Sequence, residues 1–231
     1  MTRLLVHVEG ETEESFVNSV LAAHLYSVNR RIEKVAARLV GNSRQRLRRG
    51  GICAWPAARS DIIKHLKEDP GAKATTMIDY YALPQSGPGA WPGRREASTV
   101  SFEHKAETVE EALLNDVRNE MGPNFNHSRF IPFVMMHEFE GLLFSDCTAF
   151  GSGIGRPELS ASFQSIRDSF ATPEHINDSP LTAPSKRILS LLPNYEKPLL
   201  GTLAVLEIGL LAIREQCPHF EHWISRLEQT T

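Results

Sequence analysis

Strand-like runs that end at carboxylates alternate with helix patterns in the first part of this chain. The three clearest runs cover residues 3–8, 74–78 and 130–136, and they lead to Glu9, to Asp79, and to Glu138 with Glu140. Alternation of strands and helices along a chain is typical of a parallel sheet flanked by helices. We therefore expect an α/β fold with a mostly parallel sheet.

Helix patterns lie between these runs and fill the C-terminal third. Thr12 precedes Glu13 and Glu14, which favours a helix that begins here with Thr12 as its N-cap. We expect a further strand at 35–40 and further helices at 58–68, 107–121, 158–170, 185–192, 199–214 and 220–228. Because no clear strand follows residue 150, we expect an α/β domain over residues 1–150 and a helical extension packed on it over residues 151–231.

The composition excludes several classes of protein. With 231 residues, 41% of them hydrophobic, and a formal net charge of −3, the chain can bury a substantial core without cross-links. Its three cysteines lack CxxC spacing, which suits a reducing compartment and argues against a zinc ribbon. No apolar stretch has the roughly 18 residues of a membrane span, and the N-terminus lacks the apolar core of a secretory signal. We expect a cytoplasmic protein without a membrane partner.

The carboxylates at the strand ends form the first candidate site. In a parallel sheet the carboxyl ends of neighbouring strands meet at one edge, where ligands bind. Glu138 and Glu140 are two residues apart, so on an extended chain their side chains point to the same side. Carboxylate oxygens are the ligands that Mg²⁺ prefers. The alternative interpretation is that each acid caps a helix or lies in a solvated turn.

Positive charge is concentrated in one part of the chain. Residues 30–49 contain eight Lys and Arg side chains and one acid, a local charge of +7, so the remaining residues carry −10. Four of these side chains precede Gly50 and Gly51 in a loop, namely Arg44, Arg46, Arg48 and Arg49. The loop is a candidate contact for the phosphates of a nucleic acid. A solvated loop or a contact with an acidic partner subunit would have the same composition.

Two further basic pairs are weaker candidates. Lys186 and Arg187 begin a predicted helix, where the helix dipole disfavours cations, so they need an anion or an acidic neighbour. The Pro- and Gly-rich segment 83–98 is expected to be a long exposed loop, and it carries Arg94 and Arg95 beside Trp91. Tyr80 and Tyr81, which follow Asp79, would either contact a phosphate or base or pack as ordinary aromatic side chains.

Several motifs of the chain resemble known families. The segment 8–13, Val-Glu-Gly-Glu-Thr-Glu, resembles the first motif of Toprim domains, the catalytic fold of topoisomerases, primases and OLD-type nucleases. The wider set of motifs is similar to that of an uncharacterised bacterial Toprim-like family whose members often neighbour ATPases of anti-phage systems. The set comprises VEGxTE, IDYY at 78–81, HEFEGLLF at 137–144, APSKR at 183–187 and CPHF at 217–220.

The resemblance implies roles for individual residues. Glu9 matches the strand-end glutamate of Toprim domains, which ligates metal or acts as general acid and base. Asp79 matches the first acid of their Asp-x-Asp motif, whereas Tyr81 stands at the position of the second acid. Either the site binds one metal ion less tightly, or Glu138 and Glu140 supply the missing oxygens.

The resemblance and the acid pattern together lead to one main hypothesis. It is a Mg²⁺- or Mn²⁺-dependent nuclease with Glu9, Asp79, Glu138 and Glu140 as catalytic and metal-binding residues, acting on DNA or RNA. The resemblance further implies an effector of anti-phage defence that a separately encoded ATPase controls, since this chain has no P-loop. The alternative is a Toprim-like binding or regulatory subunit without chemistry. The oligomeric state stays open, and a homo-oligomer is compatible with the sequence.

Overall fold

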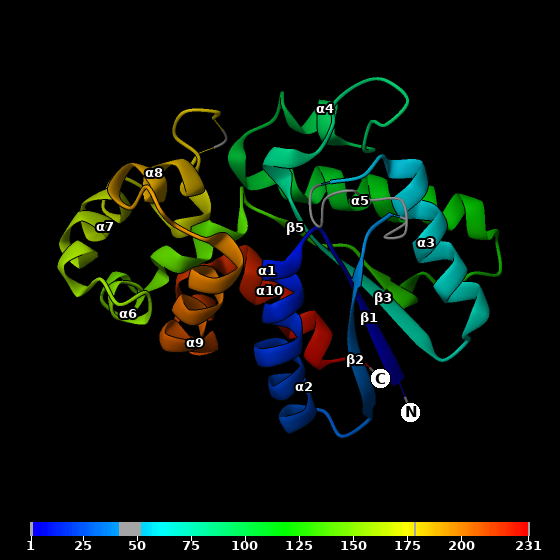
Figure 1. Cartoon of the computed structure of the whole chain (residues 1–231). Helices are drawn as coiled ribbons and strands as arrows, with labels where there is room; N and C mark the ends of the chain where they lie inside the picture. Colours follow the sequence, from blue (N-terminus) through cyan, green and yellow to red (C-terminus); the bar gives the residue numbers. More distant parts are fainter. Residues whose placement is uncertain (1, 42–51, 178, 231) are drawn as a thin grey trace.

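The computed structural model of the chain describes residues 2–41, 52–177 and 179–230, and its centre is a parallel sheet (Figure 1). The strands lie in the order β2-β1-β3-β4, β5 pairs with the end of β3, and every pairing is parallel. The strands are β1 (Thr2–Val8), β2 (Ile32–Leu39), β3 (Ala72–Asp79), β4 (Phe130–Ile131) and β5 (Val134–Met135). The predicted α/β class with a mostly parallel sheet is confirmed.

Helices cover both faces of this sheet and continue beyond it. They are α1 (Glu11–Phe16), α2 (Ala22–Val28), α3 (Trp55–Glu68), α4 (Arg94–Ala97), α5 (Phe102–Met121), α6 (Cys147–Gly153), α7 (Ser160–Arg167), α8 (Pro184–Leu191), α9 (Lys197–Gln216) and α10 (Pro218–Glu228). A π-helical turn, Val17–Leu21, joins α1 to α2. Among the described residues no helix combines the length and the apolar character that a membrane crossing requires.

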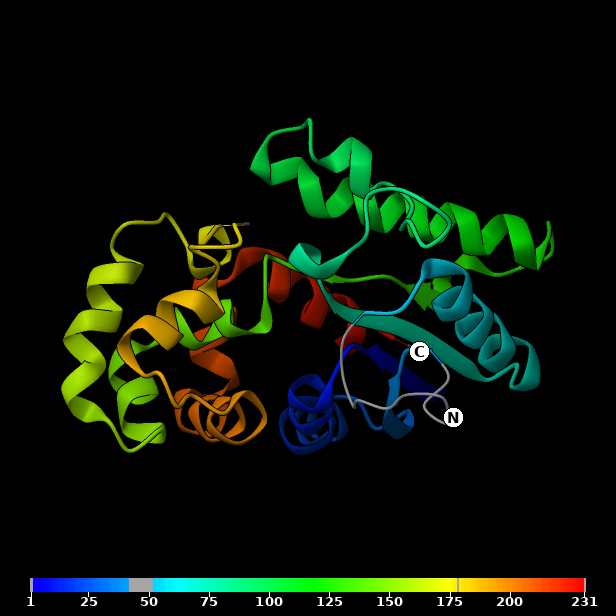
Figure 2. The same cartoon turned by 45° about the horizontal axis from the view of Figure 1, so that its top comes forward.

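Two hydrophobic cores lie on opposite faces of the sheet. On one face Leu4 and Val6 of β1 pack with helices α1, α2 and α10, and on the other face Ala74 and Ile78 of β3 pack with α3 and α5. Figure 2 shows α3 and α5 on one side of the strands and α1 with α2 on the other. Helices therefore cover both faces of the sheet, as expected for a parallel sheet.

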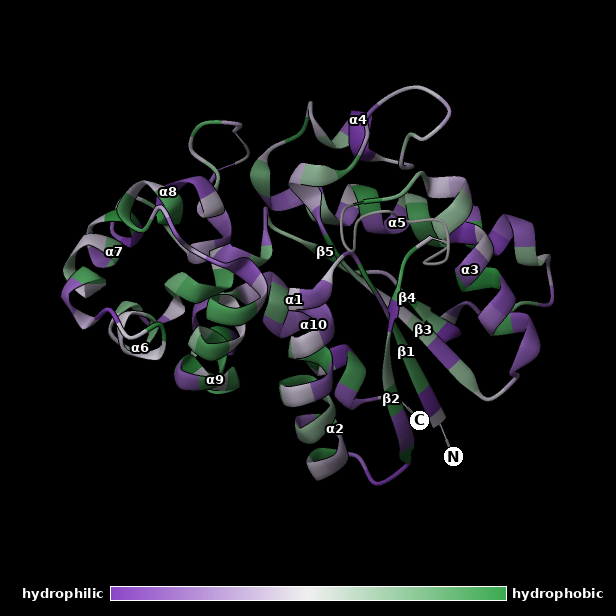
Figure 3. Ribbon diagram, in the orientation of Figure 1, coloured by the Kyte–Doolittle hydropathy of each residue, from purple (hydrophilic) through white to green (hydrophobic). Residues whose placement is uncertain are grey.

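The C-terminal helices are connected to the sheet through buried contacts. Helices α6 to α9 pack together beside α1, and α9 carries a run of hydrophobic residues that is green in Figure 3. Helix α10 returns to the sheet, where the Trp223 ring stacks on Phe133 at 4.3 Å and its Nε1 donates to the Thr75 hydroxyl over 2.8 Å. One core therefore contains residues of both expected parts of the chain, while the boundary near residue 150 stays a prediction.

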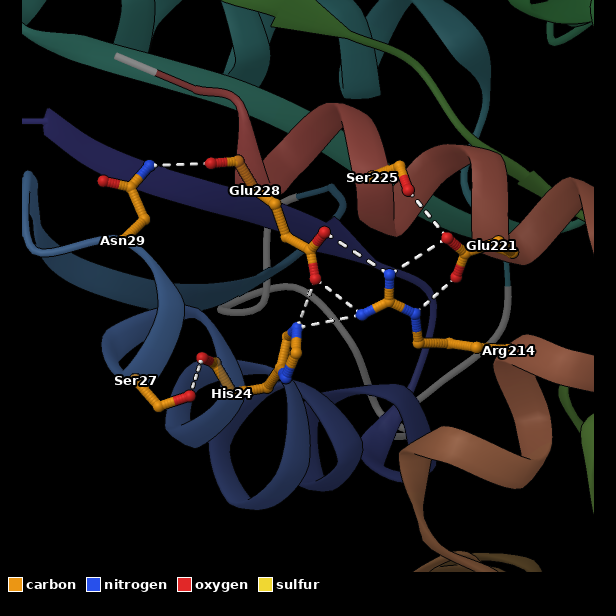
Figure 4. A network of polar contacts seen from close by, with 7 residues as sticks. All are labelled: His24, Ser27, Asn29, Arg214, Glu221, Ser225 and Glu228. Carbon is orange, nitrogen blue, oxygen red and sulfur yellow. Dashed lines mark hydrogen bonds and ion pairs between the residues drawn. The ribbon is translucent and has the colours of Figure 1, made fainter.

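A polar network fixes the last helices to the N-terminal ones (Figure 4). The guanidinium of Arg214, near the end of α9, is paired with both Glu221 and Glu228 of α10. His24 of α2 contacts Glu228 at 2.6 Å, and Asn29 donates to the backbone carbonyl of Glu228 at 3.0 Å. Helix α2 thus shares one set of charge-assisted hydrogen bonds with the consecutive helices α9 and α10, which are far from it in sequence.

The prediction of one continuous strand over residues 130–136 is wrong, because the structure has two short strands there, β4 and β5. Pro132 lies at the break and has no backbone N–H to donate to a neighbouring strand. The Thr76 side chain replaces the missing ladder: its hydroxyl accepts from the Phe133 N–H and donates to the Phe133 carbonyl, both at 2.8 Å.

Two other local expectations are also wrong. Helix α1 begins at Glu11 with Gly10 as its N-cap, and the Glu13 carboxylate accepts a hydrogen bond from the Gly10 N–H at 2.9 Å. This contact from the third helical residue, the half of a capping box that a glycine N-cap permits, fixes the start two residues earlier than Thr12 would. The 83–98 segment is not fully exposed, because Trp91 is buried against Trp55 and donates to the Cys53 carbonyl.

Candidate functional site

The four predicted acids come together at the carboxyl edge of the sheet. Glu9 follows β1, Asp79 ends the adjacent β3, and Glu138 and Glu140 follow β5, which pairs with β3. Oδ1 of Asp79 accepts from the Phe139 N–H at 3.0 Å, and the Asp79 backbone N–H is near enough to the Glu9 carboxylate to act against the rise of its pKa. Asp79 thus connects three separate strand ends, as parallel strand directions predicted.

A fifth carboxylate, Glu13, joins this group from the first turn of α1. The charges of Glu9 and Glu140 both act on it, and Glu13 is itself buried. Burial, reinforced by the neighbouring carboxylates, raises the pKa of Glu9 and that of Glu13 to about 7. The same two causes raise the pKa of Asp79 well above its ordinary value, and burial is the main cause that raises the pKa of Glu140. The sequence suggested only a dipole role for Glu13.

Glu138 is held by the beginning of α8. Its Oε2 accepts from the backbone N–H of Ser185 at 2.9 Å, and both side chains are buried. The amino end of a helix carries a partial positive charge that favours a carboxylate. The APSKR segment therefore adjoins the acids. The contact is made by the backbone N–H of Ser185 and not by the cations Lys186 and Arg187.

The two cations of that segment point elsewhere. Arg187 donates to the Thr182 carbonyl at 2.8 Å and to the Asn177 side chain at 3.1 Å, and its guanidinium lies 4.9 Å from the centre of the Phe170 ring. Lys186 is exposed. The guanidinium of Arg187 is thus used within the fold, and among the described residues neither side chain forms an ion pair with the acid cluster.

The cation that does enter the acid cluster is Lys197, the first residue of α9. Its Nζ lies 3.1 Å from Oε2 of Glu140, which is almost fully buried, whereas the Lys197 side chain is 44% exposed. Burial alone would lower the pKa of Lys197, but the charges of Glu140, Glu138 and Asp79 raise it overall. No local sequence pattern indicates this contact, because Lys197 lies 57 residues after Glu140 and belongs to none of the motifs.

Tyr80 supports the end of β3, and Tyr81 lies beside the acids. Tyr80 is buried, and Arg94 donates to its carbonyl and to its hydroxyl, each at 3.0 Å, with the guanidinium 3.8 Å above the ring. The expectation that Arg94 contacts phosphate is therefore wrong. The Tyr81 N–H donates to the His137 carbonyl at 3.1 Å, which ties the β3 end to the segment before Glu138.

The chemistry of these donors fits a hard divalent cation. Five carboxylates lie close enough to interact electrostatically, and Lys197 pairs with one of them, Glu140. Oε2 of Glu9 is buried without a hydrogen-bond partner, so it is available to a cation. Within the described ranges no three His, Cys, Asp or Glu side chains already surround a common point as metal ligands. Binding of Mg²⁺ or Mn²⁺ here would therefore require the carboxylates to turn toward one ion.

The predicted phosphate-binding loop lies outside the described residues. It contains Arg44, Arg46, Arg48 and Arg49. The last described residue before them, Gly41, donates its N–H to the Asp61 side chain of α3 at 3.0 Å.

Comparison with protein families identifies the chain. It matches the model of the domain of unknown function DUF4276 over residues 8–228. No curated protein and no solved structure matches it. Because the match spans nearly the whole sequence, the chain belongs to this family.

Proposed function

We propose that this DUF4276 protein is a Mg²⁺- or Mn²⁺-dependent nuclease that cleaves phosphodiester bonds of DNA or RNA. The observation that carries the proposal is the convergence of five carboxylates and one lysine at the carboxyl edge of a parallel sheet. The raised pKa values of Glu9 and Glu13, about 7, are typical of functional carboxylates rather than of solvated turn residues.

The resemblance to Toprim domains supports the same proposal. Glu9 and Asp79 are the residues that match Toprim acids, and they follow the adjacent parallel strands β1 and β3. Tyr81 occupies the position of the second motif aspartate. We infer that Glu138 and Glu140 supply the oxygens that this aspartate would have supplied, since β5 carries them to the end of β3.

Each group of the cluster has a distinct proposed role. A bound divalent cation would polarise the phosphodiester and lower the pKa of a coordinated water. Glu9, Asp79, Glu138 and Glu140 would hold that cation, and the start of α8 keeps Glu138 in place. Glu13, with a pKa of about 7, is suited to exchange a proton near neutral pH. Lys197 would offset the negative charge of the phosphate.

The setting of the enzyme rests on the family resemblance. We propose a cytoplasmic effector of anti-phage defence whose activity a separately encoded ATPase controls. Nucleic acid would be contacted by the 44–49 loop and by the exposed Lys186, because cations can attract the phosphate backbone without reading its sequence.

Two observations favour a second function, that of a non-catalytic subunit. Lys197 already compensates part of the negative charge of the acid cluster. Tyr81 has no carboxylate that could bind a second metal ion. Such a protein would keep the fold and bind a partner or nucleic acid without cleaving it.

The deciding experiment compares cleavage and metal binding. Purified protein is incubated with plasmid, single-stranded DNA and tRNA with Mg²⁺ or Mn²⁺, beside Glu9→Gln and Asp79→Asn. Glu120→Gln is the matched control, since Glu120 is an exposed acid of α5 that faces Arg59. We expect cleavage by the wild type and control only. Equal cleavage by all four proteins would refute the site.

A metal-binding measurement separates the two functions. A ligand that binds only the folded state raises its stability, so Mn²⁺ should raise the melting temperature of the wild type and not of Asp79→Asn. Absence of stabilisation by Mn²⁺ in the wild type, together with no cleavage of any substrate, would favour the non-catalytic subunit.

A further inference from the structure

The hydroxyl of Tyr195 is a buried polar group that the fold does not use. Tyr195 lies between α8 and α9, two residues before Lys197, and only 6% of it is exposed. Its Oη has no hydrogen-bond partner among the described residues. Burial and the charge of Glu140 raise the pKa of the phenol, so the hydroxyl stays protonated and can donate.

Such a hydroxyl is unfavourable unless something accepts its hydrogen bond. A buried donor without an acceptor costs about 1–3 kcal/mol, whereas phenylalanine would fill the same space without this cost. Tyr26 provides the contrast within the same chain, because its hydroxyl accepts from the Val35 N–H at 2.8 Å and so contributes to the fold. The Tyr195 hydroxyl therefore calls for an acceptor that is not part of the protein.

The hydroxyl lies against Gly201 of α9, close to Thr12 of α1. A Cβ atom at Gly201 would lie 3.1 Å from the Tyr195 Oη and 3.3 Å from Cγ2 of Thr12. Glycine at this point of α9 thus keeps the hydroxyl from being displaced. The charge of Glu140, which acts on the phenol, belongs to the carboxylate that also binds Lys197.

We propose that the Tyr195 hydroxyl donates a hydrogen bond to a non-bridging phosphate oxygen of the substrate, beside the Lys197 ammonium. The inference deepens the proposed nuclease function and rests on it for the identity of the phosphate as a phosphodiester. A neutral donor and a cation together give an oxyanion two partners where carboxylates alone would repel it.

The test uses Tyr195→Phe, which removes only the hydroxyl, with Tyr26→Phe as the matched control. We expect the rate of cleavage by Tyr195→Phe to fall on the order of 100-fold, the lower end of the loss caused by removing one oxyanion-hole donor. Its melting temperature should stay equal or rise, since the unsatisfied donor is gone. Tyr26→Phe should show the reverse: unchanged cleavage and a lower melting temperature.

Inorganic phosphate separates this inference from the nuclease proposal. Added with Mg²⁺, it should raise the melting temperature of the wild type and of Tyr26→Phe, and raise that of Tyr195→Phe much less. This result in a wild type that cleaves nothing would refute the nuclease and retain the phosphate site. Absence of stabilisation by phosphate in the wild type would overturn the inference. Equal stabilisation of Tyr195→Phe and the wild type would also overturn it, because it would show that the hydroxyl bonds only to water.

Discussion

The ammonium of Lys197 lies 3.1 Å from Oε2 of Glu140, and this contact joins the first residue of α9 to the carboxyl edge of the sheet. Glu140 is almost fully buried and is surrounded by other carboxylates. A buried charge is tolerated when it is paired, and removal of one partner leaves the other uncompensated. Lys197 is therefore the counter-ion that makes the acid cluster compatible with folding.

Lys197→Met should destabilise the metal-free protein at neutral pH. We expect a loss of about 1–2 kcal/mol in the free energy of unfolding, less than for a fully buried pair because the lysine is partly exposed. Urea denaturation with EDTA measures the loss, and added Mg²⁺ should recover part of it. Lys64→Met is the control, since Lys64 and Glu68 form an exposed pair 3.9 Å apart. An equal effect of both substitutions would contradict the role of Lys197.

The raised pKa values predict how stability depends on pH. Between the ordinary glutamate pKa of 4.5 and the value of about 7 for Glu9 and Glu13, the folded protein binds more protons than the unfolded chain. The free energy of unfolding in EDTA should therefore be highest near pH 5 and decrease as the pH rises through about 7. The total decrease should be a few kcal/mol, since each unit of pKa shift corresponds to about 1.4 kcal/mol.

Glu13→Gln tests this dependence directly. Glutamine can still accept the Gly10 N–H, while it removes one proton-binding carboxyl from the cluster. We expect a flatter pH profile from denaturation at pH 5, 6, 7 and 8, and a higher stability than the wild type at pH 8. The exposed control Glu120→Gln should keep the wild-type slope. A wild-type stability that increases from pH 5 to pH 8 would show that the acids are not buried together.

Parallel topology explains which parts of the site could be predicted. Once residues 3–8 and 74–78 are strands of one parallel sheet, their ends must lie at the same edge, so Glu9 and Asp79 are brought together by the backbone alone. The same argument covers Glu138 and Glu140, although the strand before them is broken at Pro132. Local sequence pattern sufficed because each acid ends its strand or lies within five residues after it.

Contacts that depend on the packing of distant helices could not be predicted. Lys197 reaches Glu140 only because α9 packs beside α1 and the 139–145 turn, and no local pattern encodes that position. The same limit applies to Arg94. The exposed-loop interpretation predicted it in solvent, whereas the structure buries it against the Tyr80 ring. Positive charge near a predicted site is thus weak evidence of where that charge lies in the fold.

A double-mutant cycle tests the packing around Tyr195. In Gly201→Ala the new Cβ would crowd the Tyr195 hydroxyl and the Thr12 methyl, which should offset the gain of up to about 1 kcal/mol that alanine gives inside a helix. In the Tyr195→Phe background the oxygen is absent, so the same substitution should be more favourable. Chemical denaturation of the four proteins should give a coupling of about 0.5–1 kcal/mol. Strict additivity would show that Gly201 does not adjoin the hydroxyl.

The Arg214 network should respond to pH in the opposite direction from the acid cluster. Hydrogen bonds from Arg214 lower the pKa of Glu221, and the same guanidinium with His24 outweighs burial to lower the pKa of Glu228. Their contribution is therefore present above the ordinary value of 4.5 and is lost as the pH falls through the lowered values.

Arg214→Met should destabilise the protein by about 1–3 kcal/mol at pH 7, because it leaves two partly buried carboxylates facing each other without a cation. The difference from the wild type should shrink at pH 3, where both carboxyls are increasingly protonated. Denaturation midpoints at the two pH values measure this. Arg156→Met, which breaks the exposed pair with Glu158, should change stability by less than about 0.5 kcal/mol at either pH. A loss that is as large at pH 3 as at pH 7 would mean that Arg214 stabilises the helices by packing of its side chain and not by its charge.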